Sequence, residues 1–325
     1  MSRPPSHQAG NGDRRPPNHP AAPPLPHARL QSGQYDAEAN RIITMLEYQA
    51  REKDREINQK LLMELVGNYA QLERELTEKQ LQIEEDLRAA ASIQRSLLPH
   101  HLPTLDPFVF AAKFIPCNFL GGDMFNVFSV TEDILGIYML DVSGHGIPAA
   151  MVTVSVSQTI QETWSSTLPH SPREVLESLE KDYPFERFEK FFTIVYLLLD
   201  TTTGHLHYCN AGHPPPILMR ADGRLETLET GGGIVGLSGM LPFDEEEKKM
   251  EPGDTLLLYT DGLSEYENAA GEFYGQERLA ALLPELRRLE PDALVEEVLG
   301  SMMGFGRNRA VQDDVALLAI RYREV

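Results

Sequence analysis

The chain has 325 residues with 42% hydrophobic side chains, which is enough for one catalytic domain with a core and one additional segment. Its formal net charge of −20 at pH 7 argues against binding of nucleic acid or of an anionic membrane by the bulk surface. The 2 cysteines, Cys117 and Cys209, provide no disulfide framework. Both lie in apolar strand-like contexts, which indicate buried free thiols and a reducing compartment.

The sequence contains no pattern typical of a membrane or secreted protein. Its longest apolar run, residues 191–199, includes Thr193 and is shorter than the ~18 residues that a membrane-spanning helix needs. The first residues are dominated by Pro, His, Arg and Gly, without the apolar core of a signal peptide. We therefore expect a cytoplasmic protein that binds neither membrane nor nucleic acid.

Residues 1–36 are rich in proline and poor in large apolar side chains, so burial cannot offset the entropy of ordering them. We predict a disordered, partly polyproline-like tail. A ligand for a proline-recognition domain is the functional alternative to a tail without a role. The prolines are Pro4-Pro5, Pro16-Pro17, Pro20 and Pro23-Pro24.

Residues 37–98 contain no proline, a single glycine (Gly67) and many Glu, Lys, Gln, Leu and Arg, which predicts one long helix. Several of its leucines and isoleucines recur every eleven residues. An eleven-residue apolar repeat favours a straight or slightly right-handed coiled coil, and hence a homodimer. The alternative is a single amphipathic helix that packs on its own domain. Leu65, Leu76 and Leu87 recur at this spacing, as do Leu72 and Ile83, with intervening steps through Asn68, Lys79 and Ala90.

Residues 99–325 are predicted to form one domain in which strands and paired helices occupy separate places. This order is typical of an α+β architecture rather than of alternating βαβ units. Strands are predicted at 108–115, 124–130, 134–140, 191–199, 205–209, 217–219, 255–260 and 315–322, with a hairpin around 200–204. Helices are predicted at 148–164, 172–181, 276–289 and 291–303.

Four turns centred on aspartate lie next to the predicted strands. An aspartate at a strand end, followed by a glycine-containing turn and a helix, is a common way to hold a metal ion or a phosphate at the edge of a sheet. Taken singly, each aspartate is better explained as a turn or cap residue, and only the ordered set favours a metal site. The four turns are Gly121-Gly122-Asp123, Asp141-Val142-Ser143-Gly144-His145-Gly146, Tyr259-Thr260-Asp261-Gly262 and Gln312-Asp313-Asp314-Val315.

In this order, the four motifs resemble the metal-dependent (PPM-type) Ser/Thr protein phosphatases. Within them, the sequence is similar to the bacterial SpoIIE/RsbU-like branch that regulates sigma-factor partner switching. The resemblance covers roughly residues 92–325 and implies a β-sandwich flanked by helix pairs. Three further segments carry it: Ile93-Gln94-Arg95-Ser96-Leu97-Leu98-Pro99, Asn210-Ala211-Gly212-His213-Pro214 and Tyr274-Gly275-Gln276-Glu277-Arg278-Leu279.

The resemblance also implies two Mn²⁺ or Mg²⁺ ions and a set of catalytic ligands. Two such cations about 4 Å apart activate water and clamp the oxygens of a phosphoryl group. Carboxylates and a backbone carbonyl suffice as ligands for these ions. By resemblance, Asp141 bridges both ions, Asp123 and the carbonyl of Val142 complete one, and Asp261 and Asp313 hold the other.

Several neighbouring residues have open roles. Two adjacent acids on a strand point to opposite faces, so Asp313 is placed first and Asp314 is treated as accessory. Glu265 is either a ligand for a metal-held water or a solvated acid. The spacing of His145 from the metal aspartate differs from that of the wider phosphatase family, so no catalytic role is carried over to it. His213 is expected to fix a strand end.

Two further features bear on the number of metal ions and on substrate binding. Asn126 departs from the branch, in which an acid is common at that position, and this leaves a third metal ion without support. The glycine-rich residues 231–239 are predicted to be a mobile substrate flap. No Lys or Ser/Thr follows these glycines in Walker fashion, which excludes a nucleotide-triphosphatase loop.

The predicted function is a metal-dependent phosphatase that removes phosphate from serine or threonine of a regulatory protein. The resemblance implies an anti-sigma-factor antagonist of the STAS type as the substrate. Two alternatives remain at this point. One is an inert phosphatase-fold scaffold that acts through its coiled coil, and the other is a two-metal hydrolase of small phosphoesters.

Overall fold

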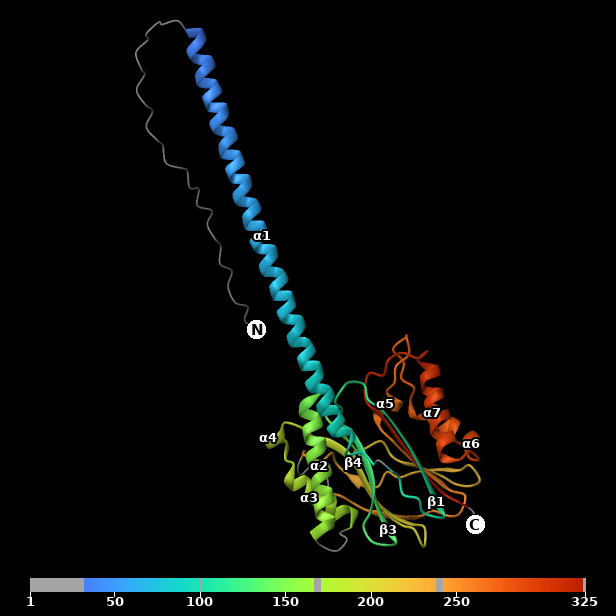
Figure 1. Cartoon of the computed structure of the whole chain (residues 1–325). Helices are drawn as coiled ribbons and strands as arrows, with labels where there is room; N and C mark the ends of the chain where they lie inside the picture. Colours follow the sequence, from blue (N-terminus) through green and yellow to red (C-terminus); the bar gives the residue numbers. More distant parts are fainter. Residues whose placement is uncertain (1–31, 100, 167–170, 238–241, 324–325) are drawn as a thin grey trace, which may run out of the picture. The chain divides into compact units, whose positions relative to one another are not determined.

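The computed structural model describes residues 32–99, 101–166, 171–237 and 242–323 (Figure 1). The chain divides into two compact units, Met1–Thr77 and Glu78–Val325. Residues 1–31 of the predicted tail lie outside the described residues. No helix within the described ranges combines the length and the apolar character needed to cross a membrane.

Helix α1 (Ser32–Arg95) confirms the predicted long helix, with 64 residues. It begins at Ser32 rather than at residue 37 and ends at Arg95 rather than at residue 98. The last turn tightens, because Leu97 and Leu98 donate backbone hydrogen bonds to the carbonyls three residues before them. Pro99 disfavours helical geometry in the residue before it, so the helix cannot continue into the domain.

The second unit contains two sheets, as the α+β prediction requires. One sheet has the strand order β1-β11-β10-β6-β7, and the other has the order β2-β3-β4-β5-β8, with β9 also paired to β5. All pairs are antiparallel except β5 with β8. The first sheet comprises β1 (Phe108–Ile115), β6 (Ile217–Met219), β7 (Leu225–Thr227), β10 (Thr255–Tyr259) and β11 (Val315–Tyr322). The second comprises β2 (Asp123–Ser129), β3 (Ile134–Val142), β4 (Phe192–Asp200), β5 (His205–Ala211), β8 (Gly231–Gly232) and β9 (Glu246–Lys249).

Three hydrophobic clusters show how the layers stack. Alternate side chains of both sheets, such as Phe110, Leu197 and Leu318, meet in a central core. The outer face of the first sheet packs on α6 (Gln276–Leu286) and α7 (Pro291–Phe305). The outer face of the second packs on α2 (Ile147–Ser166) and α3 (Pro172–Asp182). The fold is therefore a β-sandwich flanked by helix pairs, as the sequence resemblance implies.

Most long elements and the short strand β6 agree with the sequence prediction, but five other short elements were missed. Strand β1 and strand β11 have the predicted bounds, and α3 begins with the predicted Ser171 cap, which also forms a capping box with Glu174. Helix α6 ends at Leu286 instead of residue 289. The short helices α4 (Phe185–Phe188) and α5 (Asp261–Ser264), like β7, β8 and β9, have too few residues to show a periodic pattern.

The predicted glycine flap is wrong for its first part. Gly231 and Gly232 form β8, which pairs with Asn210 and Ala211 at the end of β5. A Cβ atom added at Gly231 would lie 1.7 Å from the carbonyl oxygen of Asn210. Glycine is required here because two backbones approach closely, and not because the segment must move. Residues 238–241 of the predicted flap lie outside the described residues.

We therefore predict that Gly231→Ala destabilises the domain by about 2 kcal/mol or more, since the strand must shift to relieve the overlap. Chemical denaturation monitored by circular dichroism measures the change. The matched control is Gly67→Ala, because a Cβ at Gly67 meets nothing within 4 Å. That control should leave the domain transition unchanged. An equal, small effect of both variants would contradict the close-approach explanation.

Candidate metal centre

The predicted aspartates meet at one end of the sandwich. Asp123 at the start of β2 lies opposite Asp141 near the end of β3 in the antiparallel register. Asp261 follows β10 and opens α5, while Asp313 and Asp314 directly precede β11. Because β10 and β11 are antiparallel neighbours, the end of one lies beside the start of the other. Carboxylates from both sheets thus converge on one place.

Two glycines let the backbone approach these acids. A Cβ added at Gly121 would lie 1.7 Å from Oδ2 of Asp314. A Cβ at Gly122 would lie 2.6 Å from the carbonyl oxygen of Val142 and 3.2 Å from Oδ1 of Asp141. The carbonyl of Val142 and the carboxylate of Asp141 therefore lie together over Gly122, which places two of the predicted ligand oxygens side by side.

Two helices hold the Gly121-Gly122 turn in place. The Gln94 side chain at the end of α1 donates to the carbonyl oxygen of Gly121 at 2.8 Å and accepts from the amide of Gly121 at 3.3 Å. On α2, the buried hydroxyl of Thr153 donates to the carbonyl oxygen of Gly122 at 2.7 Å. Both backbone groups of Gly121 are thus satisfied by one amide side chain, which fixes the turn that leads into Asp123.

A third contact fixes the loop that follows Asp141. Lys190 donates from Nζ to the carbonyl oxygen of Ser143 at 2.8 Å, and the amide of Ser143 donates to the carbonyl of Phe191 at 2.9 Å. Thr153 and Lys190 were not predicted from the sequence. Neither belongs to a motif, because a single threonine on a helix or a lysine before a strand has no distinguishing local pattern.

Burial and mutual repulsion raise the pKa values of the cluster. The pKa of Asp123 lies well above its usual range because of burial and then of repulsion from Asp141 and Asp314. Burial and the charge of Asp261 raise the pKa of Asp141 to about 7. Burial and the charges of Asp313 and Glu265 raise the pKa of Asp261 to about 6.

Two carboxylate oxygens of the cluster are buried without a hydrogen-bond partner among the described residues, namely Oδ2 of Asp123 and Oδ1 of Asp261. Buried oxygens of this kind are costly unless a cation or a donor satisfies them. Oxygen donors alone, without a histidine or thiolate in the set, are the ligands that Mg²⁺ and Mn²⁺ favour. The residues present therefore fit a divalent-cation centre.

The two adjacent acids before β11 differ in burial. Asp314 is buried, and its Oδ1 accepts from the amide of Cys117 at 2.8 Å, whereas Asp313 is exposed. Both charges act on the cluster, since each raises the pKa of Asp141. Asp313 was placed first and Asp314 treated as accessory, but Asp314 is the more buried of the two and the charges of both act on Asp141.

Cys117 was predicted to be a buried thiol, and this is wrong, because it is only partly buried beside the same two acids. One potential ligand atom from each of Cys117, Asp313 and Asp314 lies within 4.8 Å of the other two. Burial and the charge of Asp314 raise the pKa of Cys117 to about 12, so the thiol is neutral at physiological pH. Cys209 is fully buried, as predicted.

The remaining candidates lie around the cluster. His145 is exposed, and its charge lowers the pKa of Asp313 against the larger upward effect of burial. Glu265 is exposed near Asp261. His213, expected to fix a strand end, lies with its Nδ1 2.9 Å from Oγ1 of Thr193 on β4, and its amide donates to Oδ1 of Asn210 at 2.8 Å. The buried Asn126 is used within its own strand, where its Oδ1 accepts from the amide of Val127.

The chain is similar to a known protein family and to solved structures. The family model described as "Stage II sporulation protein E (SpoIIE)" matches residues 131–323, which is more than half of the chain. Among solved structures, the RsbU and RsbW domains of a protein from Mycobacterium tuberculosis share 30% identity with this chain. That comparison covers 66% of this chain and 60% of the other, with a TM-score of 0.58.

Two curated relatives are also similar to this chain. Protein IcfG from Synechocystis sp. is 26% identical over 72% of this chain and 41% of its own length. The phosphoserine phosphatase RsbP from Bacillus subtilis is 29% identical over 56% of this chain and 46% of its own length. The matched region is thus less than half of each of these two relatives.

We predict that the metal-free domain loses stability as pH rises. The pKa values of Asp141 and Asp261 in the folded state lie above their unfolded value of 3.8, so the folded protein holds protons that the unfolded chain releases. In EDTA, the Tm should fall between about pH 4 and pH 7. Asp141→Asn should flatten this dependence and stabilise the metal-free protein at pH 8 by on the order of 2 kcal/mol.

Differential scanning calorimetry at several pH values makes this measurement. Excess Mn²⁺ should raise the Tm of the wild type at pH 8 and should have a much smaller effect on Asp141→Asn. The matched control is Asp133→Asn, which removes an exposed carboxylate from the turn between β2 and β3. A Tm in EDTA that rises steadily from pH 4 to pH 8 would be incompatible with a repulsive carboxylate cluster.

Proposed function

The chain belongs to the SpoIIE family, and from this we infer that it is a metal-dependent protein phosphatase that hydrolyses phosphoserine or phosphothreonine on a regulatory protein. The observation that carries this proposal is the convergence of buried and half-buried carboxylates from both sheets, two of which leave an oxygen without a hydrogen-bond partner within the described residues. The name of RsbP, a phosphoserine phosphatase, supports the type of reaction.

We assign the ligands of two Mn²⁺ or Mg²⁺ ions to the cluster. Asp141 lies between the acids of the two sheets, because Asp123 faces it in the strand register and the charge of Asp261 raises its pKa. It therefore suits the bridging role. The proposed ligands are Asp123, Asp141 and the carbonyl of Val142 on one side, with Asp261 and Asp313 on the other and Asp314 beside them.

When bound, divalent cations would lower the pKa of a water molecule and neutralise charge on a phosphoryl group. The protein contributes rigid placement of the carboxylates. Gln94 and Thr153 fix the turn before Asp123, and Lys190 fixes the loop after Asp141. Each acid is placed by a strand end or by a backbone hydrogen bond, so little reorganisation is needed when a phosphorylated side chain arrives.

For the substrate we propose an anti-sigma-factor antagonist of the STAS type. The support is the sequence similarity to the branch of phosphatases that regulates partner switching, together with the RsbU and RsbW domains found in the solved structure from M. tuberculosis. A protein substrate also agrees with the open position of the site, since Asp313 and His145 are exposed at its rim.

We further propose that the chain forms a homodimer through residues 37–98. Large apolar side chains of α1 are exposed along the first unit, and exposed apolar surface does not stabilise an isolated helix. The seam residues Leu65, Leu72 and Leu76 are 65%, 55% and 60% exposed. Leu87 differs, because it packs against the cluster of Ala91, Leu120 and Ala150. Burial between two helices would remove the exposed seam from water.

The metal assignment predicts that Asp141→Asn lowers turnover by at least about tenfold, since loss of a bridging ligand removes a charge that both ions share. The assay measures release of phosphate from p-nitrophenyl phosphate and from a phosphorylated protein in Mn²⁺. EDTA should stop the wild-type reaction and Mn²⁺ should restore it. Asp133→Asn is again the matched control. More than a tenth of the wild-type rate in a variant with unchanged Mn²⁺ binding would refute the assignment.

The same assays distinguish the two alternatives. An inert scaffold would release no phosphate from either substrate under any metal condition. A hydrolase of small phosphoesters would act on p-nitrophenyl phosphate and leave the phosphorylated protein intact. The proposed protein phosphatase should act on both.

The dimer proposal predicts that Leu65→Lys with Leu76→Lys shifts the chain toward the monomer, because two charges would be buried in the seam. Light scattering at tens of micromolar measures the mass. The control is Gln71→Lys, a polar and exposed position on the same helix. A wild-type chain that is monomeric at that concentration would contradict the proposal. Leu87 is left unchanged because it contacts the domain.

A further inference from the structure

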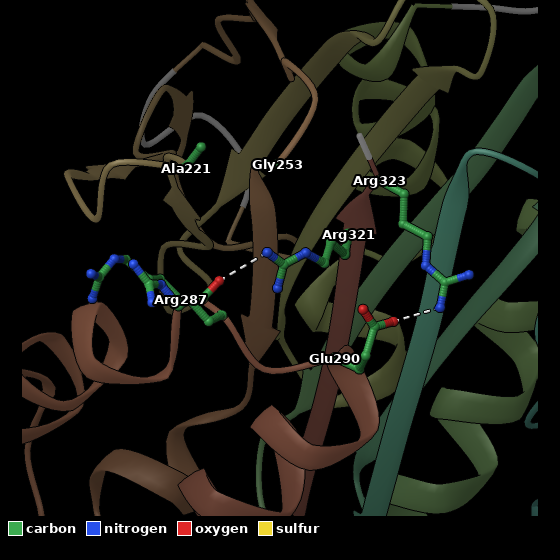
Figure 2. A pocket seen from close by; sticks show the side chains of 7 residues that line it. Ala221, Gly253, Arg287, Glu290, Arg321 and Arg323 are labelled. Carbon is green, nitrogen blue, oxygen red and sulfur yellow. Dashed lines mark hydrogen bonds and ion pairs between the residues drawn. The ribbon is translucent and has the colours of Figure 1, made fainter. Parts of the chain in front are cut away.

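A pocket lined by arginine side chains lies at the end of the first sheet that is remote from the carboxylate cluster (Figure 2). Strand β11 links the two places, since Asp314 precedes it and Arg321 lies near its end. An extended strand covers about 24 Å between those two residues, at ~3.4 Å per residue. The pocket has a volume of about 500 Å³. Its lining residues are Ala221, Gly253, Arg287, Arg288, Glu290, Arg321 and Arg323.

The pocket is basic in a strongly acidic chain. Its lining contains four arginines and one glutamate, whereas the whole chain has a formal charge of −20. Guanidinium groups remain charged at all physiological pH values. Charges of one sign gathered in a hollow reinforce one another's field, so this part of the surface attracts anions that the rest of the protein repels.

Backbone carbonyls hold two of the guanidinium groups in place. Arg321 donates to the carbonyl oxygens of Leu289 and Arg287, at 2.5 and 2.9 Å, and Figure 2 shows it reaching toward Arg287. Arg287 donates to the carbonyl oxygen of Pro284 at 2.9 Å. These bonds use only some of the five N–H donors of each group. The remaining donors are therefore fixed in position before any ligand arrives.

The other two guanidinium groups are available to a ligand. The side chain of Arg288 has no hydrogen-bond or ion-pair partner within the part of the chain that the structure describes. Arg323 pairs with Glu290 at 2.5 Å, and both side chains are about half exposed, at 50% and 56%. An exposed pair of this kind contributes little, so an incoming anion can replace Glu290 as the partner of Arg323.

The start of α7 does not add to the attraction for anions. Glu290 is the N-cap residue of this 15-residue helix, and its side chain makes no capping hydrogen bond. The first helical turn contains Pro291, which has no amide hydrogen, and Asp292, whose carboxylate repels anions, and neither residue lines the pocket. The attraction for anions therefore comes from the four arginines.

We propose that this pocket binds a small polyanion that carries two or more phosphate groups. The planar fork of arginine matches phosphate oxygens in pairs, which lysine does not. Four guanidinium groups from the end of α6 and the end of β11 exceed what one phosphate can contact. The volume is in the range of small-molecule sites. This binding does not depend on the metal centre, so it stands or falls separately from the proposed phosphatase activity.

Isothermal titration calorimetry on the full chain in EDTA and 0.1 M NaCl tests the proposal, since EDTA keeps divalent ions from the added anions. Pyrophosphate and tripolyphosphate should bind with one site per chain, at least about tenfold more tightly than inorganic phosphate. The double variant Arg288→Gln/Arg323→Gln should weaken pyrophosphate binding about tenfold or more. Neither substitution touches the carbonyl contacts of Arg321, so the fold should be preserved. Glu290→Gln should tighten binding, because Arg323 then loses its competing partner.

The matched control is Arg173→Gln/Arg187→Gln, which removes the same charge from exposed positions outside the pocket. It should leave the affinity for pyrophosphate within about twofold of the wild type. Equal weakening in both double variants would show that only net charge matters and would overturn the proposal. So would the absence of binding at millimolar pyrophosphate, or binding of an oligo-glutamate peptide in place of the phosphates.

Discussion

Repulsion among buried carboxylates is the interaction on which the rest of the structure depends. Asp123, Asp141 and Asp261 are carried by strand ends of different sheets, and burial makes their charges costly. A sandwich without a cation would be more stable with neutral side chains at these positions. The surrounding hydrogen bonds therefore have to hold the acids together against a force that drives them apart.

The turn before Asp123 shows how this is done. The Gln94 side chain forms hydrogen bonds with both backbone groups of Gly121. The hydroxyl of Thr153 donates to the carbonyl oxygen of Gly122. Small residues are needed there because any side chain at Gly121 would overlap the carboxylate of Asp314. Since Gln94 belongs to the last turn of α1, the end of the long helix and the first metal-site turn form one hydrogen-bonded unit.

Charge is distributed unevenly along the first sheet. At the start of β11 the acids Asp313 and Asp314 face the proposed metal ions, and at its end Arg321 and Arg323 face a separate pocket. A short, rigid strand thus separates a centre suited to cations from one suited to anions. The acidic surface elsewhere repels anions, whereas the arginine pocket attracts them, so the two ends of the strand differ in electrostatic potential.

The sequence by itself determined the long helix, the strands with continuous apolar runs and the four aspartate turns, because these depend on local periodicity and on short motifs. It could not determine the roles of Gly231, Thr153 and Lys190, since each depends on a backbone or side chain far away along the chain. It also could not place Asp314, because its burial follows from the turn that packs against Gly121. The arginine pocket could not be predicted from the sequence for the same reason. Its residues come from separate turns, and only the pairing of the sheet brings them together.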